Sequence, residues 1–236
     1  MIWYSYKGIP YHGDCPAFYD LSSLKWFVEL TNNQQKIKSL VLDYLKQEGI
    51  EIEKYFNTNL VTGKENWKVS PFLFWGNRNE KNISKGKELF SMFENIRGIT
   101  GLCISILPSQ TSVKPHYGDT DAVYRIHIPV KIPCQLPSCG LRVNGIEKSW
   151  EPTELLTFCD AHLHEAWNHS PETRIVLIVD VLREEYLSKQ KNICLNVLSL
   201  LHLQQLINSH KWINSLPALG KGVLRIILKT RLLVKS

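Results

Sequence analysis

Apolar residues recur at two different spacings along this chain, and the spacings separate helical from extended segments. Between residues 21 and 46 they return every three or four positions, which is typical of one or two amphipathic helices. Later segments are short, rich in β-branched and aromatic residues, and bounded by turn residues, as strands are. The pattern predicts a mainly β fold with flanking helices, with a second helix over 87–96 and strands over 70–75, 99–107, 123–128, 155–158 and 174–182.

One hairpin can be placed within this pattern. Asn144-Gly145 separates Leu141-Arg142-Val143 from Ile146-Glu147-Lys148, and Asn-Gly is the strongest short signal for a two-residue type I′ turn. With 236 residues and 44% hydrophobic content, the chain can bury a full core in one main domain.

Charge divides the chain near residue 185. The net charge is +6, yet eight basic residues and no acidic one follow Glu185, so residues 1–185 are slightly acidic. We therefore divide the chain into a main domain over 1–185 and a basic, helical C-terminal extension over 186–236. Its leucine-rich segments with interleaved cations suit helices that pack on the main domain, form a dimer contact, or lie on a membrane surface; packing is favoured slightly.

The N-terminus and the cysteines point to a cytoplasmic protein, with peripheral membrane contact left open. The first residues lack the basic start and apolar run of a signal peptide, and no run of eighteen apolar residues occurs. The six cysteines form no Cys-x-x-Cys pair, and reduced thiols are expected over disulfides. Nucleic-acid binding is disfavoured, because no recognised module appears.

Two histidines, each followed by an arginine, are the strongest candidates for functional residues in this chain. His116 precedes Arg125 and His127, which share one face of a predicted strand because they are two residues apart. His164 precedes Arg174, which stands at the mouth of an apolar strand and must find an anionic partner there. Two neutral imidazoles can hold a divalent metal, and an arginine can grip a carboxylate. This set suits a metal enzyme with a carboxylic acid as co-substrate.

The segment from Pro115 to Arg183 resembles the aspartyl/asparaginyl β-hydroxylase family of iron and 2-oxoglutarate dioxygenases. The matching motifs are Pro115-His116-Tyr117-Gly118, Arg125-Ile126-His127, His164-Glu165-Ala166-Trp167-Asn168 and Arg174. The resemblance spans roughly residues 55 to 185. It implies a double-stranded β-helix, the jelly-roll or cupin-like fold, with helices outside.

The resemblance also implies the roles of the site residues. His116 and His164 match the iron(II) ligands, Arg125, His127 and Arg174 match 2-oxoglutarate-binding positions, and Ser105 matches a serine that reaches the same co-substrate. Dioxygen is the second co-substrate, and succinate and carbon dioxide are co-products. Gly118 stands where commoner dioxygenases carry a carboxylate ligand. Asp119 and Asp121 have the wrong offset for that role but stay as reserve candidates, and His162 is a rival to His164.

The resemblance leaves the substrate open. The first expectation is β-hydroxylation of an aspartyl or asparaginyl side chain in a peptide, or of a related small molecule. The alternatives are a hydroxylase of lipid acyl chains working at a membrane face, and a binding module that keeps the barrel without oxidation.

Overall fold

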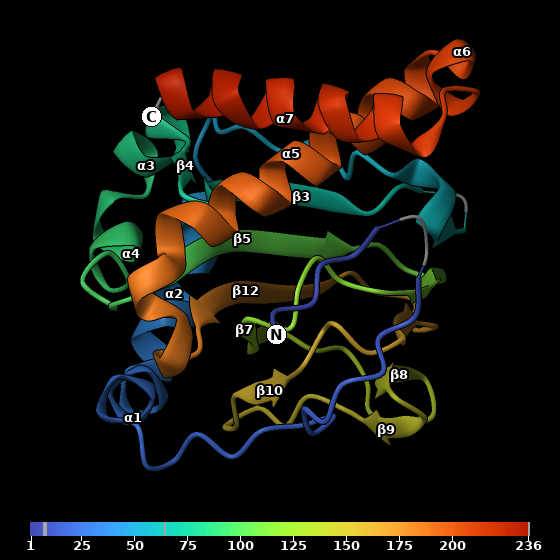
Figure 1. Cartoon of the computed structure of the whole chain (residues 1–236). Coiled ribbons are helices and arrows are strands. Elements are labelled where there is room, and N and C mark those ends of the chain that lie inside the picture. Colours follow the sequence, from blue (N-terminus) through green and yellow to red (C-terminus); the bar gives the residue numbers. More distant parts are fainter. Residues whose placement is uncertain (7–8, 64, 236) are drawn as a thin grey trace.

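The computed structural model describes residues 1–6, 9–63 and 65–235 and consists of two antiparallel sheets with helices outside (Figure 1). The larger sheet has the order β1-β3-β5-β12-β7-β10, with β4 paired to β3. Its strands are β1 (Glu53–Lys54), β3 (Lys68–Phe74), β4 (Asn77–Arg78), β5 (Ile99–Leu107), β7 (Val123–Lys131), β10 (Leu156–Phe158) and β12 (Arg174–Leu182). The predicted strands over 99–107 and 174–182 are confirmed at both ends.

The smaller sheet has the order β2-β6-β11-β8-β9. Its strands are β2 (Val61–Thr62), β6 (Thr111–His116), β8 (Cys139–Val143), β9 (Ile146–Lys148) and β11 (His164–Asn168). The Asn144-Gly145 hairpin is confirmed: both residues have positive φ, 49° and 80°, and they join β8 to β9. The two sheets face each other across apolar side chains that include Leu141, Ala166 and Val176. This is the predicted jelly-roll core.

The outer face of the larger sheet is covered by N-terminal helices. Ile104, Ile126 and Leu177 pack there against buried side chains such as Ile37 and Val41. The predicted helical region over 21–46 is two helices, α1 (Lys25–Asn32) and α2 (Gln34–Leu45), which meet at Asn33. The predicted helix over 87–96 is shorter, since α4 (Lys87–Ser91) gives way to turns, and α3 (Glu80–Lys85) precedes it. A short 3₁₀ turn, η1 (Thr58–Leu60), lies before β2.

The C-terminal extension adds η2 (Glu184–Lys189), α5 (Gln190–Ser209), α6 (Lys211–Asn214) and α7 (Ala218–Lys235). Helix α5 buries Ile193, Val197 and Leu198 against the end of the larger sheet, where Val123 and Leu182 lie. Helix α7 lies along the outer side of α5 (Figure 1). None of the helices in the described ranges combines the length and apolar character that a membrane span needs.

One pair of cysteines departs from the expectation of reduced thiols. Cys134 and Cys139 form a disulfide, because the turn before β8 brings their Cα atoms to 5.4 Å, within the range that a disulfide can bridge. Cys15, Cys103, Cys159 and Cys194 are free thiols, as expected. The prediction was wrong for this pair because spacing along the chain did not show that the turn closes on itself.

Candidate active site

His116 and His164 meet between neighbouring strands of the smaller sheet. They are partners in the β6–β11 register, and their ring centroids lie 4.1 Å apart. Each ring has Nδ1 hydrogen-bonded to the carbonyl two residues earlier, Lys114 O at 2.8 Å and His162 O at 2.9 Å. A carbonyl only accepts, so each Nδ1 carries the proton and each Nε2 presents a lone pair. The pair could therefore hold a metal through the two Nε2 atoms, for which no hydrogen bond occurs among the described residues.

The protonation of both histidines agrees with that role. Burial lowers the pKa of His116, and burial followed by the neighbouring His116 lowers the pKa of His164 well below its usual range. Both imidazoles are therefore neutral at pH 7, the state in which histidine binds a metal. The rival, His162, lies outside β11 and has Nε2 against the Cys15 carbonyl at 2.7 Å, which ties it to the N-terminal segment.

Arg174 begins β12 and is buried, with no ion-pair partner among the described residues. Its side chain is 2% exposed, and Nε and Nη1 have no hydrogen-bond partner among the described residues. The guanidinium lies 4.3 Å over the ring of Trp150, and burial alone lowers its pKa to about 9. An unpaired buried cation is strongly unfavourable. The buried guanidinium of Arg174 is therefore a position where an anion would bind favourably.

Two further donors lie on the same inner face as Arg174. Ser105 pairs with Val176 in the β5–β12 register, two residues from Arg174, and its hydroxyl accepts from Trp67 Nε1 at 2.9 Å, which leaves the O–H to donate. His127 Nδ1 accepts from Trp150 Nε1 at 3.2 Å, so Nε2 carries the proton. Burial, then the charges of Arg174 and Arg125, lowers the pKa of His127 well below its usual range, so the ring is neutral. Guanidinium, hydroxyl and imidazole N–H together form a set of donors that suits a carboxylate.

Arg125, unlike Arg174, is paired with carboxylates of the protein. Its Nε and Nη2 donate to the two oxygens of Asp180, each at 2.8 Å, and Nη1 pairs with Asp160 Oδ2 at 2.6 Å. A Cβ at position 101 would lie 3.0 Å from Asp180 Oδ2, so Gly101 leaves the room that this carboxylate uses. The structure brings Arg125 to the predicted inner face, but both edges of its guanidinium are already occupied by carboxylates.

Asp160 fills the space beside the missing carboxylate ligand. A Cβ at Gly118 would lie 2.1 Å from Asp160 Oδ2, and Gly118 N donates to Asp160 O at 2.7 Å. Burial, opposed by Arg125, raises the pKa of Asp160 to about 7, and its Oδ1 has no hydrogen-bond partner among the described residues. Asp160 therefore fills the space beside Gly118 from the loop before β11, a contribution that the sequence did not reveal.

The reserve candidates face other groups. Asp119 Oδ2 accepts from Trp75 Nε1 at 2.9 Å, and Asp121 Oδ1 accepts from Trp3 N at 2.8 Å. Within the described ranges no three His, Cys, Asp or Glu side chains are close enough to form a metal site. The two histidines, His116 and His164, are therefore the residues here that could hold a metal together.

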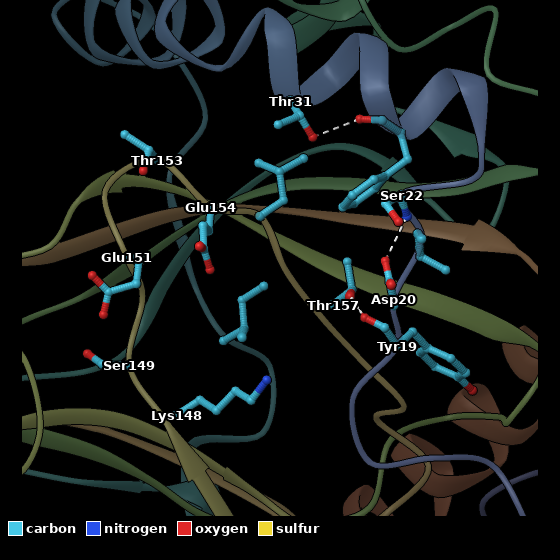
Figure 2. A pocket seen from close by; sticks show the side chains of 14 residues that line it. Tyr19, Asp20, Ser22, Thr31, Lys148, Ser149, Glu151, Thr153, Glu154 and Thr157 are labelled. Carbon is cyan, nitrogen blue, oxygen red and sulfur yellow. Dashed lines mark hydrogen bonds between the residues drawn. The ribbon is translucent and has the colours of Figure 1, made fainter.

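A separate cleft of about 600 Å³ lies outside this centre. It is lined by Tyr19–Ser22, parts of α1 and the segment 148–157, and Figure 2 shows Glu151, Glu154 and Lys148 around it. Strand β10 separates it from the histidines, because Phe158 contacts the rings of His127 and His164 while its neighbour Thr157 lines the cleft.

Comparisons with known proteins cover the part of the chain that carries these site residues. A sequence profile described as aspartyl/asparaginyl beta-hydroxylase matches residues 31–184. An ornithine lipid ester-linked acyl 2-hydroxylase from Rhizobium tropici is 28% identical over 171 residues, which cover 71% of this chain and 61% of that protein. The human aspartyl/asparaginyl beta-hydroxylase is 27% identical over 192 residues, which cover 74% of this chain and 25% of that protein. The chain thus spans less than two thirds of either relative.

Solved structures give lower similarity. A 2OG-Fe(II) oxygenase family oxidoreductase from Burkholderia pseudomallei is 12% identical, with 75% of this chain and 97% of that chain covered and a TM-score of 0.44. A Pseudomonas putida prolyl-4-hydroxylase is 14% identical, with 64% and 88% covered and a TM-score of 0.41.

Proposed function

Since the chain belongs to the aspartyl/asparaginyl β-hydroxylase family, we propose that it is an iron(II)- and 2-oxoglutarate-dependent hydroxylase. The observation that carries this proposal is the unpaired guanidinium of Arg174. A buried cation that faces a serine hydroxyl and a neutral histidine N–H is a site prepared for an organic anion. The nearby pair of neutral histidines supplies metal ligands but leaves most of a metal's coordination positions to other groups.

The residues divide the work between metal and co-substrate. His116 and His164 would hold iron(II) through Nε2, while Arg174, Ser105 and His127 bind and orient the carboxylates of 2-oxoglutarate. Bound iron with this co-substrate lets dioxygen place one oxygen atom in a substrate C–H bond and the other in succinate, as 2-oxoglutarate loses carbon dioxide. Arg125 would act on this centre through its charge, which lowers the pKa of both histidines, because its own hydrogen bonds are taken by Asp160 and Asp180.

Two substrate classes deserve testing. The family name favours an aspartyl or asparaginyl side chain of a peptide, or a related small molecule. A second candidate, the acyl chain of a lipid, is favoured by the Rhizobium tropici relative and by the exposed apolar side chains of α7. Within the described ranges, Arg125 is engaged by carboxylates and Arg174 is assigned to the co-substrate, so neither is left for an acidic substrate.

The metal assignment can be tested with three single variants. His116→Ala and His164→Ala should each abolish stoichiometric iron(II) binding, measured anaerobically by metal analysis after dialysis, while circular dichroism stays unchanged. His162→Ala is the matched control, because this histidine lies two residues from His164 but bonds to Cys15. Loss of iron in the control with retention in His164→Ala would reverse the assignment.

Turnover separates an enzyme from a binding module. The iron-loaded wild-type protein should form succinate from 2-oxoglutarate, faster when a true substrate is present, and the product should gain one oxygen atom. Peptides containing aspartate or asparagine and a dispersed acyl lipid are the two substrate arms, compared by mass spectrometry. Iron binding without 2-oxoglutarate binding or succinate formation in either arm would leave the non-catalytic barrel as the better account.

A further inference from the structure

Two cations of helix α7, Arg225 and Lys229, point toward the protein. Arg225 and Lys229 recur at a spacing of four residues, which places them on one side of the helix. Arg225 reaches Ser199 Oγ at 3.4 Å and Asn196 Oδ1 at 3.5 Å, and Lys229 Nζ donates to Asn192 Oδ1 and Asn196 Oδ1, each at 2.7 Å. All three partners lie on α5. The contact between the two helices therefore includes polar groups of α5 and α7 beside half-buried leucines such as Leu232.

The opposite side of α7 is apolar and exposed. We call it the outer face of α7; it consists of Leu219, Val223, Ile226, Ile227, Leu233 and Val234. Leu219, Ile226 and Val234 are 81%, 66% and 85% exposed, and Trp212 of α6, just before this helix, is 64% exposed. A helix on a protein normally buries its apolar side and exposes its polar side. In α7 the apolar outer face is exposed, and the other side combines Arg225 and Lys229 with half-buried leucines such as Leu232.

Charge decides which partner suits this face. Residues 186–236 carry eight basic and no acidic residues, and Arg231 is exposed at the margin of the outer face. A second copy of the chain would bring the same positive charge against itself. An anionic lipid surface instead offers acyl chains for the apolar side chains, while the exposed Arg231 and the net positive charge of the extension favour anionic headgroups, as in interfacial helices.

From this geometry we propose that the outer face of α7, together with Trp212, docks on an anionic lipid surface. The helix would lie in the interface plane with its apolar side in the boundary between headgroups and acyl chains. Its opposite side packs on α5 (Figure 1). The docking needs neither iron nor 2-oxoglutarate, so it stands apart from the proposed reaction.

The test is co-sedimentation of the full chain with vesicles of phosphatidylcholine alone or mixed with phosphatidylglycerol. Wild type should bind the mixed vesicles and lose binding as salt rises from about 0.1 M to about 1 M, because the Debye length shrinks from about 10 Å to about 3 Å. The triple variant Leu219→Ser, Val223→Ser, Ile226→Ser should bind the mixed vesicles at least about tenfold more weakly than wild type, since it removes apolar area that would otherwise leave water. These side chains are exposed, so the fold should be kept, which circular dichroism checks.

The matched control is Val28→Ser, Ile52→Ser, Ile146→Ser, which removes exposed apolar side chains outside the extension and should bind like wild type. Three outcomes would overturn the proposal: no vesicle binding by wild type, equal binding by the triple variant, or equal loss in the control. A wild-type dimer in sedimentation velocity that the triple variant splits, without vesicle binding, would assign the face to a second copy instead.

Discussion

Two arginines, the half-buried Arg125 and the buried Arg174, extend from the same inner face of the larger sheet, and their surroundings are opposite. Arg125 is bound on three nitrogens by Asp160 and Asp180, and a third carboxylate, Asp119, also acts on its charge. Arg174 has no carboxylate partner among the described residues, and two of its nitrogens are without any hydrogen bond. The first arrangement is complete as it stands, whereas the second lacks its anion. Residue type alone does not distinguish an arginine with a structural role from one that binds a ligand. The number of carboxylates that pair with each guanidinium does distinguish them.

The largest expected difference between the two arginines is in stability. Arg125→Leu leaves two buried carboxylates without their cation and should lower the free energy of unfolding by roughly 3–5 kcal/mol. Arg174→Met should leave the stability of the ligand-free protein unchanged or raise it, because it removes an uncompensated charge. Urea unfolding without metal or 2-oxoglutarate measures both, and equal destabilisation by the two variants would remove the distinction.

Affinity for 2-oxoglutarate should separate the arginines in the other direction. Arg174→Lys should raise the dissociation constant about tenfold or more, corresponding to about 1.4 kcal/mol, because lysine cannot reproduce the two-pronged contact with a carboxylate. Calorimetry with manganese(II) in place of iron measures it. Arg142→Lys is the control, since Arg142 is exposed and pairs with Glu147 and Glu165 on the smaller sheet. Unchanged affinity in Arg174→Lys would remove Arg174 from the site.

The smallest effect concerns the histidines and pH. Protons compete with the metal for Nε2, and the pKa values of His116 and His164 are lowered by burial, with Arg125 adding a positive charge nearby. Manganese(II) affinity should therefore stay flat as pH falls from about 8 to about 6.5, the ordinary imidazole value, and decline only below it. A decline that begins above that value would mean that the imidazoles are not shielded as described.

Much of this arrangement could be predicted from sequence because it is local. Strand alternation placed Arg125 and His127 on one face, and the Asn144-Gly145 pair fixed a hairpin, since both depend on neighbouring residues. The family resemblance supplied the pairing of His116 with His164 across strands 48 residues apart. Two helices over 21–46 were within the prediction, but the break at Asn33 could not be placed because one periodicity runs through the region. Helix α3 was missed because it is too short to show a periodicity.

Long-range partners could not be predicted. Asp160 and Asp180 lie 35 and 55 residues from Arg125, and acidic residues near strand ends usually face solvent. Trp150 and Trp67, which hold His127 and Ser105, are distant in the same way. In α7 the sequence showed an apolar and a basic side, but which side faces the protein depends on Asn192 and Asn196 of another helix.

The close approach of Gly118 to Asp160 restricts how this centre can change over evolution. A single replacement of Gly118 by aspartate would not create a carboxylate ligand, because its Cβ would collide with Asp160. Removing Asp160 first would open the space but would take one carboxylate from Arg125. One order passes through a protein with a steric clash at position 118, and the other through a protein in which Arg125 has lost one carboxylate. The two positions are therefore expected to change together or to stay fixed. With this pair in place, packing alone keeps a carboxylate out of position 118, independently of any advantage in the reaction.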